Sequence, residues 1–392
     1  MHDNTKPTRR LTGAIPTGAA LALAGLATVL PAQAQAQAQA NSGSSVQVYG
    51  LLDAAVGSMH NTSGINAVES PAKKQFSGGL STSRWGIQGQ EDLGEGRLAQ
   101  FDLSSFIRNE SGAAGRSDAL PAPVNVAADP YFSRAAWLGL SDPKLGRLRV
   151  GNITTLLFSN SITSNSLGDS TTFSPINLLT FVGSPLSGGT AWASSVVYDS
   201  PVIGGVSGSL AYAASQNQGG PNTAARVAYN AGPLSTSVAL QSVNRNPQTF
   251  ADGTSSNNTR AWQWAASYDF KPLKVFGHLG QIDNRGTASA PQSVQYRVWD
   301  VSAMLTMGSG RWLAAYGSRT TGDRPTAVAV TAAGGNVSRK ILTLGYSHAL
   351  SPRTEVYSLF ARDETRTRQV PTAPTVVGAT GNNFAVGIRH RF

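Results

Sequence analysis

The sequence predicts an all-β fold, a 16-stranded antiparallel transmembrane β-barrel, and three observations support this prediction. Segments of about ten residues alternate between apolar and small polar side chains, as expected for strands with two different faces. Short turns and long polar loops follow one another along the chain. Beyond residue 40, no run of about eighteen apolar residues occurs, which excludes a membrane-spanning helix. Strands in a bilayer must close into a barrel, because an open edge leaves backbone groups without hydrogen-bond partners.

The first forty residues are typical of an export signal. Basic residues at 6–10 precede an apolar stretch at 11–30, and small residues then repeat up to Ala40. A membrane-anchoring helix is the alternative, but proline and glycine interrupt the stretch. We therefore expect a signal peptide at 1–40 and the barrel at 41–392. Three other cleavage points fit as well, after Ala34, Ala36 or Ala38.

Composition narrows the possible classes of function. The chain contains no cysteine, so disulfides, thiolate metal sites and cysteine nucleophiles are excluded. Its net charge of +10 is scattered, whereas binding of nucleic acid would require basic residues clustered on one face among aromatic side chains. We expect no cofactor, no metal ion and no nucleic-acid partner.

Sixteen segments carry the strand pattern, and a closed bacterial barrel of this kind has an even number of strands. In chain order they are 45–60, 75–92, 97–108, 130–142, 147–156, 190–200, 206–216, 222–232, 233–244, 258–270, 273–284, 293–307, 311–321, 336–349, 353–364 and 381–392.

The connections between these segments alternate in length. Short turns, rich in residues that favour turn backbone angles, lie at 92–96, 142–146, 200–205, 231–233, 270–272, 308–310 and 350–352. Long, polar loops lie at 109–129, 245–257, 285–292, 322–335 and 365–380. This asymmetry is typical of short periplasmic turns and long extracellular loops.

Alternation within the segments predicts which face meets lipid. In 258–270, Trp262, Trp264 and Tyr268 share one face, whereas Gln263 and Ser267 share the other. Aromatic side chains at the two membrane interfaces belong on the outside of a water-filled barrel. A soluble β-sandwich could also segregate aromatic residues, but it would have about seven to nine strands in roughly 100 residues.

Several motifs of the chain resemble a known family. The most specific are Ser-Val-Gln-Val-Tyr-Gly-Leu-Leu-Asp-Ala at 45–54, Ser-Arg-Trp-Gly-Ile-Gln-Gly-Gln-Glu-Asp-Leu-Gly at 83–94 and Val-Gly-Ile-Arg-His-Arg-Phe at 386–392. Weaker motifs lie in the same order at 134–140 and 198–201. Together, these segments resemble the general diffusion porins of Gram-negative bacteria, especially those of betaproteobacteria. The resemblance covers essentially all of 45–392.

The resemblance implies a homotrimer in the outer membrane. Each barrel would pass small hydrophilic solutes and ions by passive diffusion, with the third extracellular loop, 157–189, folded into its lumen. Phe392 resembles the terminal signal that the barrel-assembly machinery reads, although a lipid-facing aromatic would look the same. Outer-membrane lipid and lipopolysaccharide are the further expected partners.

The resemblance also implies a constriction, in which basic residues of the wall face acidic residues of the third loop. Arg84 and Arg134 match wall positions of the family, and Asp169 lies where the family's loop carries acids. Asp53 faces inward by alternation, and so does Arg149, which either compensates as a wall charge or is a solvated charge near the periplasmic mouth. These five residues are the expected constriction.

The sequence departs from the family pattern at this constriction. Gly-Asn-Ile at 151–153 replaces the usual Gly-Arg-Gln, and Ala191 and Val197 replace basic residues of the sixth strand. Asp169 is the only charged residue within 157–189. We therefore expect a weak transverse field and weak ion selectivity, with a preference for anions.

Other functions receive less support from the sequence. Gly168-Asp169-Ser170 is a weak nucleophile motif, no Gly-x-Ser-x-Gly elbow occurs and the histidines are isolated, so we do not expect an enzyme. A barrel that only anchors or adheres is a further alternative. A substrate-selective channel is the more serious rival, with its site formed by the apolar loop residues Phe173, Leu178, Leu179 and Phe181.

Overall fold

The computed structural model describes residues 43–60, 72–115, 130–181, 187–216, 220–244, 258–286, 291–323, 336–369 and 375–392. The expected signal peptide lies outside the described residues. Within these stretches, none of the helices is long and apolar enough to cross a membrane.

The chain forms one antiparallel sheet of eighteen strands. The strands of its first half are β1 (Ser45–Met59), β2 (Ala72–Ser77), β3 (Arg84–Gly94), β4 (Arg97–Arg108), β5 (Ala113–Ala114), β6 (Ala135–Asp142), β7 (Gly146–Thr154), β8 (Ala191–Asp199) and β9 (Val206–Ala213). Those of its second half are β10 (Asn222–Ala231), β11 (Leu234–Val243), β12 (Thr259–Asp269), β13 (Leu273–Gly286), β14 (Pro291–Met307), β15 (Gly310–Asp323), β16 (Asn336–Ala349), β17 (Thr354–Gln369) and β18 (Thr375–Arg391).

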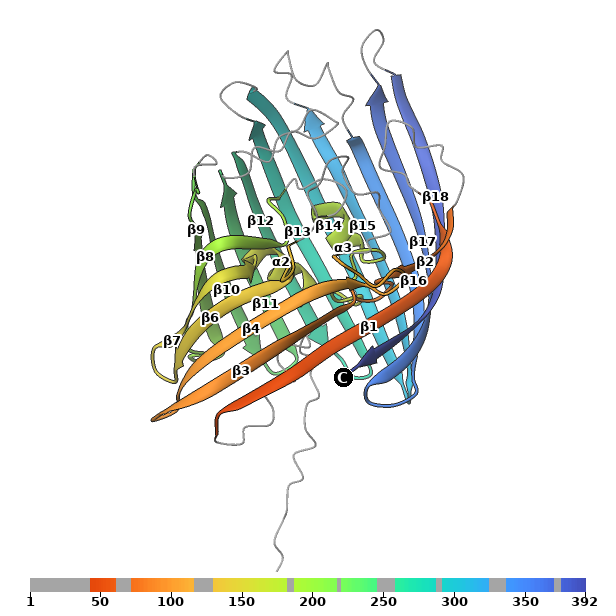
Figure 1. Ribbon diagram of the computed structural model, residues 1–392. Helices are drawn as coiled ribbons and strands as arrows, with labels where there is room; N and C mark the ends of the chain where they lie inside the picture. Colours follow the sequence, from red (N-terminus) through yellow and green to blue (C-terminus); the bar gives the residue numbers. More distant parts are fainter. Residues whose placement is uncertain are drawn as a thin grey trace, which may run out of the picture. The chain divides into compact units, whose positions relative to one another are not determined.

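The sheet closes on itself, because β1 pairs with β18 from Leu51↔Arg391 to Ser58↔Phe384. The backbone N–H of Gly50 also donates to the carbonyl of Phe392 at 3.0 Å, and the Phe392 N–H donates back at 3.1 Å. Both β2 and β3 pair with β1 and form one interrupted wall strand, whereas the two-residue β5 pairs with the end of β4. The wall therefore has sixteen strands, as predicted (Figure 1).

The largest departure from the predicted strands lies in 75–92. We expected one continuous strand there, but residues 78–83 leave the ladder and separate β2 from β3. Other differences are shifts of strand ends. β17 ends at Gln369 and β18 begins at Thr375, whereas we predicted strands at 353–364 and 381–392. Both strands are longer than predicted because the hydrogen-bonded ladder between them continues to these residues.

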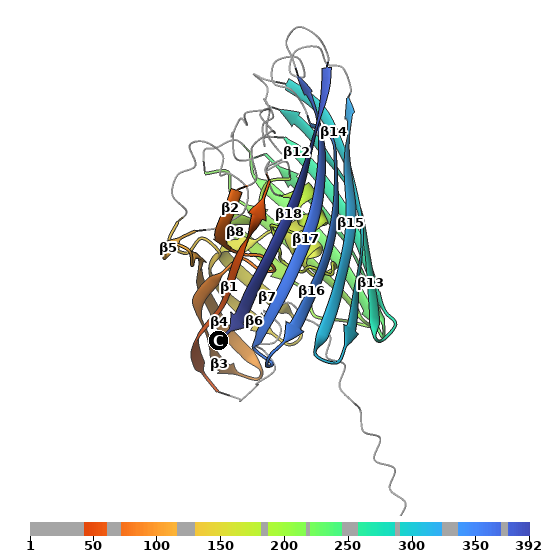
Figure 2. The ribbon, with the colours of Figure 1, turned by 90° about the vertical axis from the view of Figure 1, so that its right-hand side faces the viewer.

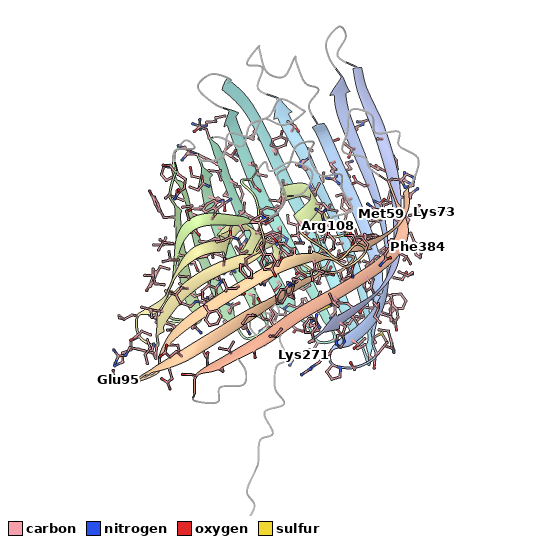
Figure 3. The ribbon with its side chains drawn as sticks, viewed as in Figure 1. Met59, Lys73, Glu95, Arg108, Lys271 and Phe384 are labelled. Carbon is pink, nitrogen blue, oxygen red and sulfur yellow. The ribbon has the colours of Figure 1, made fainter. Side chains whose placement is uncertain are left out.

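Connections alternate in length as the sequence predicts, and Figure 2 shows the short turns together at one end of the wall. The turn from β6 to β7 illustrates their chemistry. The Asp142 carboxylate accepts backbone N–H groups from Lys144 at 2.7 Å and Leu145 at 3.0 Å. Gly146 then adopts φ 90°, a left-handed angle that glycine adopts without steric cost. In Figure 3, Glu95 and Lys271 mark this end of the barrel.

The two faces of the wall differ as predicted. On β12, Trp262, Trp264 and Tyr268 are exposed on the outside, whereas Gln263 and Ser267 are buried on the inside. Exposed valine, leucine and aromatic side chains continue around the outer face, for example Phe384 on β18 (Figure 3). An outer apolar band with a polar interior is the arrangement of a barrel that lies in a bilayer.

Two short helices, α2 (Leu156–Ile162) and α3 (Pro175–Thr180), lie in the connection between β7 and β8. α2 contacts the inner faces of β10 to β12, and α3 contacts those of β14 to β16 (Figure 1). The connection thus crosses the lumen from the wall strand that precedes it. This is the predicted position of the third long loop.

Candidate functional site

Local sequence explains the helical turns of the lumen loop. The Thr155 hydroxyl caps α2 by accepting the Phe158 N–H at 3.3 Å, and Pro175 begins α3, where its missing N–H costs nothing. Asn177 links the two halves of the loop. Its amide donates to the carbonyls of Gly168 and Ser170, each at 2.9 Å.

Neutral polar side chains and one arginine hold α2 against the wall. Asn160 is fully buried and donates to the side-chain oxygen of Gln263 at 2.9 Å. Its own oxygen accepts the Ser237 hydroxyl at 2.6 Å and the Arg226 Nε at 3.1 Å. A buried amide with all these bonds satisfied stabilises one position of the helix.

Two buried arginines hold α3 from the opposite side. Arg319 donates to the Leu179 carbonyl at 2.9 Å, and Arg339 lies 3.5 Å from the Leu178 carbonyl. Arg339 also forms an ion pair of 2.6 Å with Asp363. Because carbonyls at a helix C-terminus carry partial negative charge, arginines at this position stabilise the helix end.

The apolar residues of the loop face the wall rather than the lumen. Phe173, Leu178, Leu179 and Phe181 are each 7% exposed or less. Phe158 and Phe181 also form an edge-to-face pair with ring centroids 5.0 Å apart. This packing leaves the loop without an open apolar surface at those four positions.

The structure brings Arg84 and Asp169 together. The Arg84 Nη1 lies 2.6 Å from Asp169 Oδ2, and the Ser81 hydroxyl donates to Asp169 Oδ1 at 2.6 Å. Arg84 begins β3, next to the break in the wall, whereas Asp169 comes from the lumen loop. One wall cation thus meets the one acid of the loop at mid-height in the barrel.

Asp53 lies beneath the segment between β2 and β3, and its part in the constriction stays a prediction. It faces inward, but it is completely buried. Its carboxylate accepts the backbone N–H groups of Gly79 at 3.2 Å, Leu80 at 2.9 Å and Ser81 at 2.8 Å, together with the Tyr357 hydroxyl. Asp53 therefore supports the segment 78–83, which leaves the sheet and would otherwise have unpaired backbone donors.

A second basic cluster lies beside this segment, and sequence reasoning did not select it. Arg389 donates to the Ser81 hydroxyl at 2.6 Å and, through Nε, to Glu355 at 2.9 Å. Arg311 also bonds Glu355, and Arg391 lies 3.9 Å from it. Three arginines share this one carboxylate because the register sets Glu355 on β17 opposite Arg389 on β18.

Arg134 binds the wall beside β4. Its guanidinium donates to the Tyr49 hydroxyl at 3.0 Å and the Ser104 hydroxyl at 2.9 Å, and it lies 3.5 Å from Asp102. Only 12% of its side chain is exposed. Most of its hydrogen-bonding capacity is therefore directed at the wall.

Arg149 lies toward the short turns, as the alternative interpretation of this residue expects. In the ladder it pairs with Gly139, which connects through Gln100 to Gln90 on β3. Gln90 is three inward positions closer to the turn than Arg84. Consecutive inward positions lie roughly 7 Å apart along a strand, so the register sets Arg149 closer to the short turns than Arg84, and its part in the constriction stays a prediction.

At the periplasmic mouth, Arg149 shares an acid with a neighbour. Its Nη2 lies 2.8 Å from Asp199 Oδ2, and Arg147 binds the same oxygen at 3.1 Å. The Arg149 guanidinium also lies over the Trp137 ring, 5.5 Å from its centroid. Two cations therefore face one carboxylate at this mouth.

The described residues give little support for a metal site or for a catalytic nucleophile. None of their His, Asp and Glu residues form a group of three that could hold a metal ion. One histidine is less isolated than the sequence suggested, since His278 and Asp300 form a buried pair 3.1 Å apart. The carbonyls of Gly168 and Ser170 bind the Asn177 amide, and the Ser170 hydroxyl donates to the Gly79 carbonyl at 2.7 Å, so this hydroxyl joins the lumen loop to the segment 78–83.

Comparison with known proteins decides the family. Residues 19–368 match the family model described as Gram-negative porin. The chain belongs to the Gram-negative porin family. An outer membrane porin protein of Bordetella pertussis is 26% identical, over 95% of this chain and 98% of the relative. Outer membrane porin protein 32 of Delftia acidovorans is 27% identical, over 89% and 94%.

Solved structures show the same fold. The anion-selective porin from Comamonas acidovorans has a TM-score of 0.66 at 23% identity, with 89% of this chain and 100% of that chain covered. OmpT of Vibrio cholerae, solved in a trimer form, has a TM-score of 0.61 at 13% identity, with 89% and 100% covered. The protein is thus an outer-membrane porin, a channel rather than an enzyme.

Electrostatics at Asp169 give a testable pH dependence for this porin. Burial acts to raise the pKa of Asp169, but the adjacent Arg84 guanidinium and the Ser81 hydroxyl outweigh it and hold the pKa below its usual value. A lowered folded-state pKa stabilises the docked loop at pH values above the ordinary aspartate pKa, and this contribution is lost as pH falls through the lowered value. Single-channel conductance should therefore be constant from about pH 7 to pH 5 and change only below about pH 4.

The control for this prediction is Asp169→Asn, which removes the titrating group. Its conductance should lack the step at low pH that the parent protein shows. A step between pH 5 and pH 7 in the parent, absent from Asp169→Asn, would contradict the lowered pKa.

Proposed function

We propose that this porin forms a water-filled channel for passive diffusion of small hydrophilic solutes and ions, with a weak preference for anions. The supporting observation is the balance of charge along the lumen. At mid-height, Arg84 and Asp169 pair one to one. A pair of opposite charges in contact produces little net field at a distance, so the constriction itself discriminates weakly.

The excess of basic residues lies nearer the periplasmic mouth. Arg311, Arg389 and Arg391 share Glu355, and their side chains are 26%, 10% and 35% exposed. Across the lumen, Arg147 and Arg149 share Asp199. Fixed positive charge at a channel mouth raises the local anion concentration, within a screening distance of about 8 Å at physiological salt. The similar fold of an anion-selective porin is consistent with this proposal.

Reversal potentials test the proposal directly. In a KCl gradient across a planar bilayer, the parent porin should show a small potential of the anion-selective sign, which decreases at high salt. The double variant Arg147→Gln, Arg391→Gln should lower it clearly, because the two clusters together lose two of their three excess charges while each acid keeps a partner.

A matched control is Lys144→Gln with Arg353→Gln, two exposed residues in the short turns. It removes the same charge and should change the reversal potential much less, because turn residues are screened by solvent. A clear cation preference of the parent porin at moderate salt would show that the proposed selectivity is wrong.

A substrate-specific channel finds less support. The apolar loop residues that would form its site are packed against the wall and buried. Current that falls without saturation for sugars and organic acids alike would agree with general diffusion. Saturable block by one solute would instead favour a specific site.

The same proposal includes assembly. We expect a homotrimer, which should migrate as a trimer before boiling and as a monomer afterwards on a denaturing gel. We also expect Phe392 to act as the signal for the barrel-assembly machinery. Its ring lies against Gly50, where an added Cβ would come within 2.3 Å of it, so Phe392 contributes to closure of the barrel as well.

A further inference from the structure

One arginine of the lumen, Arg226 on β10, binds a neutral partner instead of an acid. Its Nε donates at 3.1 Å to the side-chain oxygen of Asn160, a residue of the lumen-loop helix α2. Among the described residues, no carboxylate forms an ion pair with Arg226, and the acid that acts on it from further away is Asp199. Asp199 already pairs with Arg147 and Arg149, at 3.1 and 2.8 Å. The positive charge of Arg226 is therefore largely uncompensated.

Arg226 lies at the edge of α2 that faces the short turns. The helix lies against β10 and β11 (Figure 1). On β10, Ala224 belongs to the same buried apolar cluster as Leu156 of α2, so the helix covers this position. Arg226 is the next inward position toward the short turn that ends β10. Its charge is therefore on the periplasmic side of the lumen loop, where ions enter or leave the constriction.

The guanidinium end of Arg226 is open to the water of the lumen. Its side chain faces inward, on the same face of β10 as the buried Ala224 and Ala228. Arg226 itself is only partly buried, and neither of its Nη nitrogens is among the buried atoms without a partner. Within the described part of the chain, its hydrogen bond is made through Nε alone. Solutes in the lumen can therefore reach both Nη groups.

We propose that the contact between Asn160 and Arg226 is a selectivity element of the channel, in which a neutral amide fixes the arginine without neutralising it. A lone charge attracts anions over a longer range than an ion pair, because the fields of two opposite charges in contact largely cancel at a distance of about 8 Å. An acid at position 160 would hold the same arginine and cancel its charge. Because this role requires water in the lumen, it rests on the proposed channel and adds a determinant of its anion preference.

Reversal potentials of the whole porin in a KCl gradient test this contact. Arg226→Gln should lower the chloride-to-potassium permeability ratio by about twofold, because a unit charge roughly 8 Å away changes local ion concentrations by about that factor. Asn160→Asp should lower the ratio by a similar factor, although the side chain at 160 is fully buried. Arg226→Lys should retain the ratio of the parent porin, since it keeps the charge.

The matched control is Arg353→Gln, which removes the same charge from an exposed turn. Its permeability ratio should stay close to that of the parent porin. Equal changes in Arg226→Gln and Arg353→Gln would overturn the proposal. So would equal losses in Arg226→Lys and Arg226→Gln, because the packing of α2 rather than charge would then be responsible. A folded Asn160→Asp porin with the ratio of the parent would also overturn it.

The sign of the parent's potential separates this role of Arg226 from the proposed function. A parent porin that prefers cations would contradict the proposed selectivity, but Arg226→Gln should still shift the ratio toward cations by about twofold. If Asn160→Asp does not fold, as judged by heat-modifiable migration, the two substitutions of Arg226 still test the role of its charge.

Discussion

Replacement of Asp53 by asparagine is expected to lower the free energy of unfolding by about 3–5 kcal/mol. The Asp53 carboxylate is completely buried, and it accepts three backbone N–H groups from the segment between β2 and β3 as well as the Tyr357 hydroxyl. In asparagine, an NH2 group replaces one carboxylate oxygen. This NH2 group cannot accept a hydrogen bond, so several of the buried N–H and O–H groups lose their partners. Urea-induced unfolding in detergent, followed by circular dichroism, measures the effect.

Asp142→Asn is the matched control for Asp53. Its carboxylate also accepts two backbone N–H groups, but it lies in a turn open to solvent, where water replaces a lost bond. We expect a change below about 1 kcal/mol. A similar small change for Asp53→Asn would mean that the segment 78–83 does not depend on this carboxylate.

The second large effect is expected for Glu355→Gln. Arg389 is only 9% exposed, and removal of its ion-pair partner leaves this buried charge with only the more distant carboxylates of Asp53 and Asp169, which costs up to about 3–5 kcal/mol. The same change leaves one more positive charge in the lumen, since Arg311 and Arg391 also face Glu355. We therefore expect lower stability together with a stronger anion preference.

Glu364→Gln on the same strand is the control for Glu355. Glu364 pairs with Arg362 on the outer face, where the side chain is 45% exposed, so its loss should change stability by less than about 1 kcal/mol. The reversal potential should not move. If Glu355→Gln leaves both unfolding and reversal potential unchanged, the cluster around Arg389 does not determine selectivity.

Strand positions were predictable because side chains alternate between the two faces of a strand, whichever strand it pairs with. The alternation in 258–270 identified the outer tryptophans correctly. The break at 78–83 was not predictable in this way. The residues from Gly78 to Ser83 leave the ladder because Asp53, 26 residues before Gly79, replaces their sheet partners, and alternation contains no signal for this contact.

The candidate site was predictable in part. Arg84 was identified from the motif at 83–94, and Asp169 because it is the only acid in the sequence of the loop. The structure places their side chains 2.6 Å apart. The height of Arg149 could not be predicted, because alternation gives the face of a residue and not its height. Arg389 and Glu355 were missed because only the register of β17 and β18 sets them opposite each other, and Arg389 meets Ser81 only after the barrel closes.

By itself, the sequence determined which side chains face lipid and which face water, because side chains alternate every two residues along a strand. It also determined how many strands must close, because unpaired backbone groups are costly in hydrocarbon. The tertiary structure alone decided which inward charges meet. Closure pairs the first strand with the last and sets their stagger, and the loop crosses to walls far from it in sequence. Both are long-range contacts that no local pattern encodes.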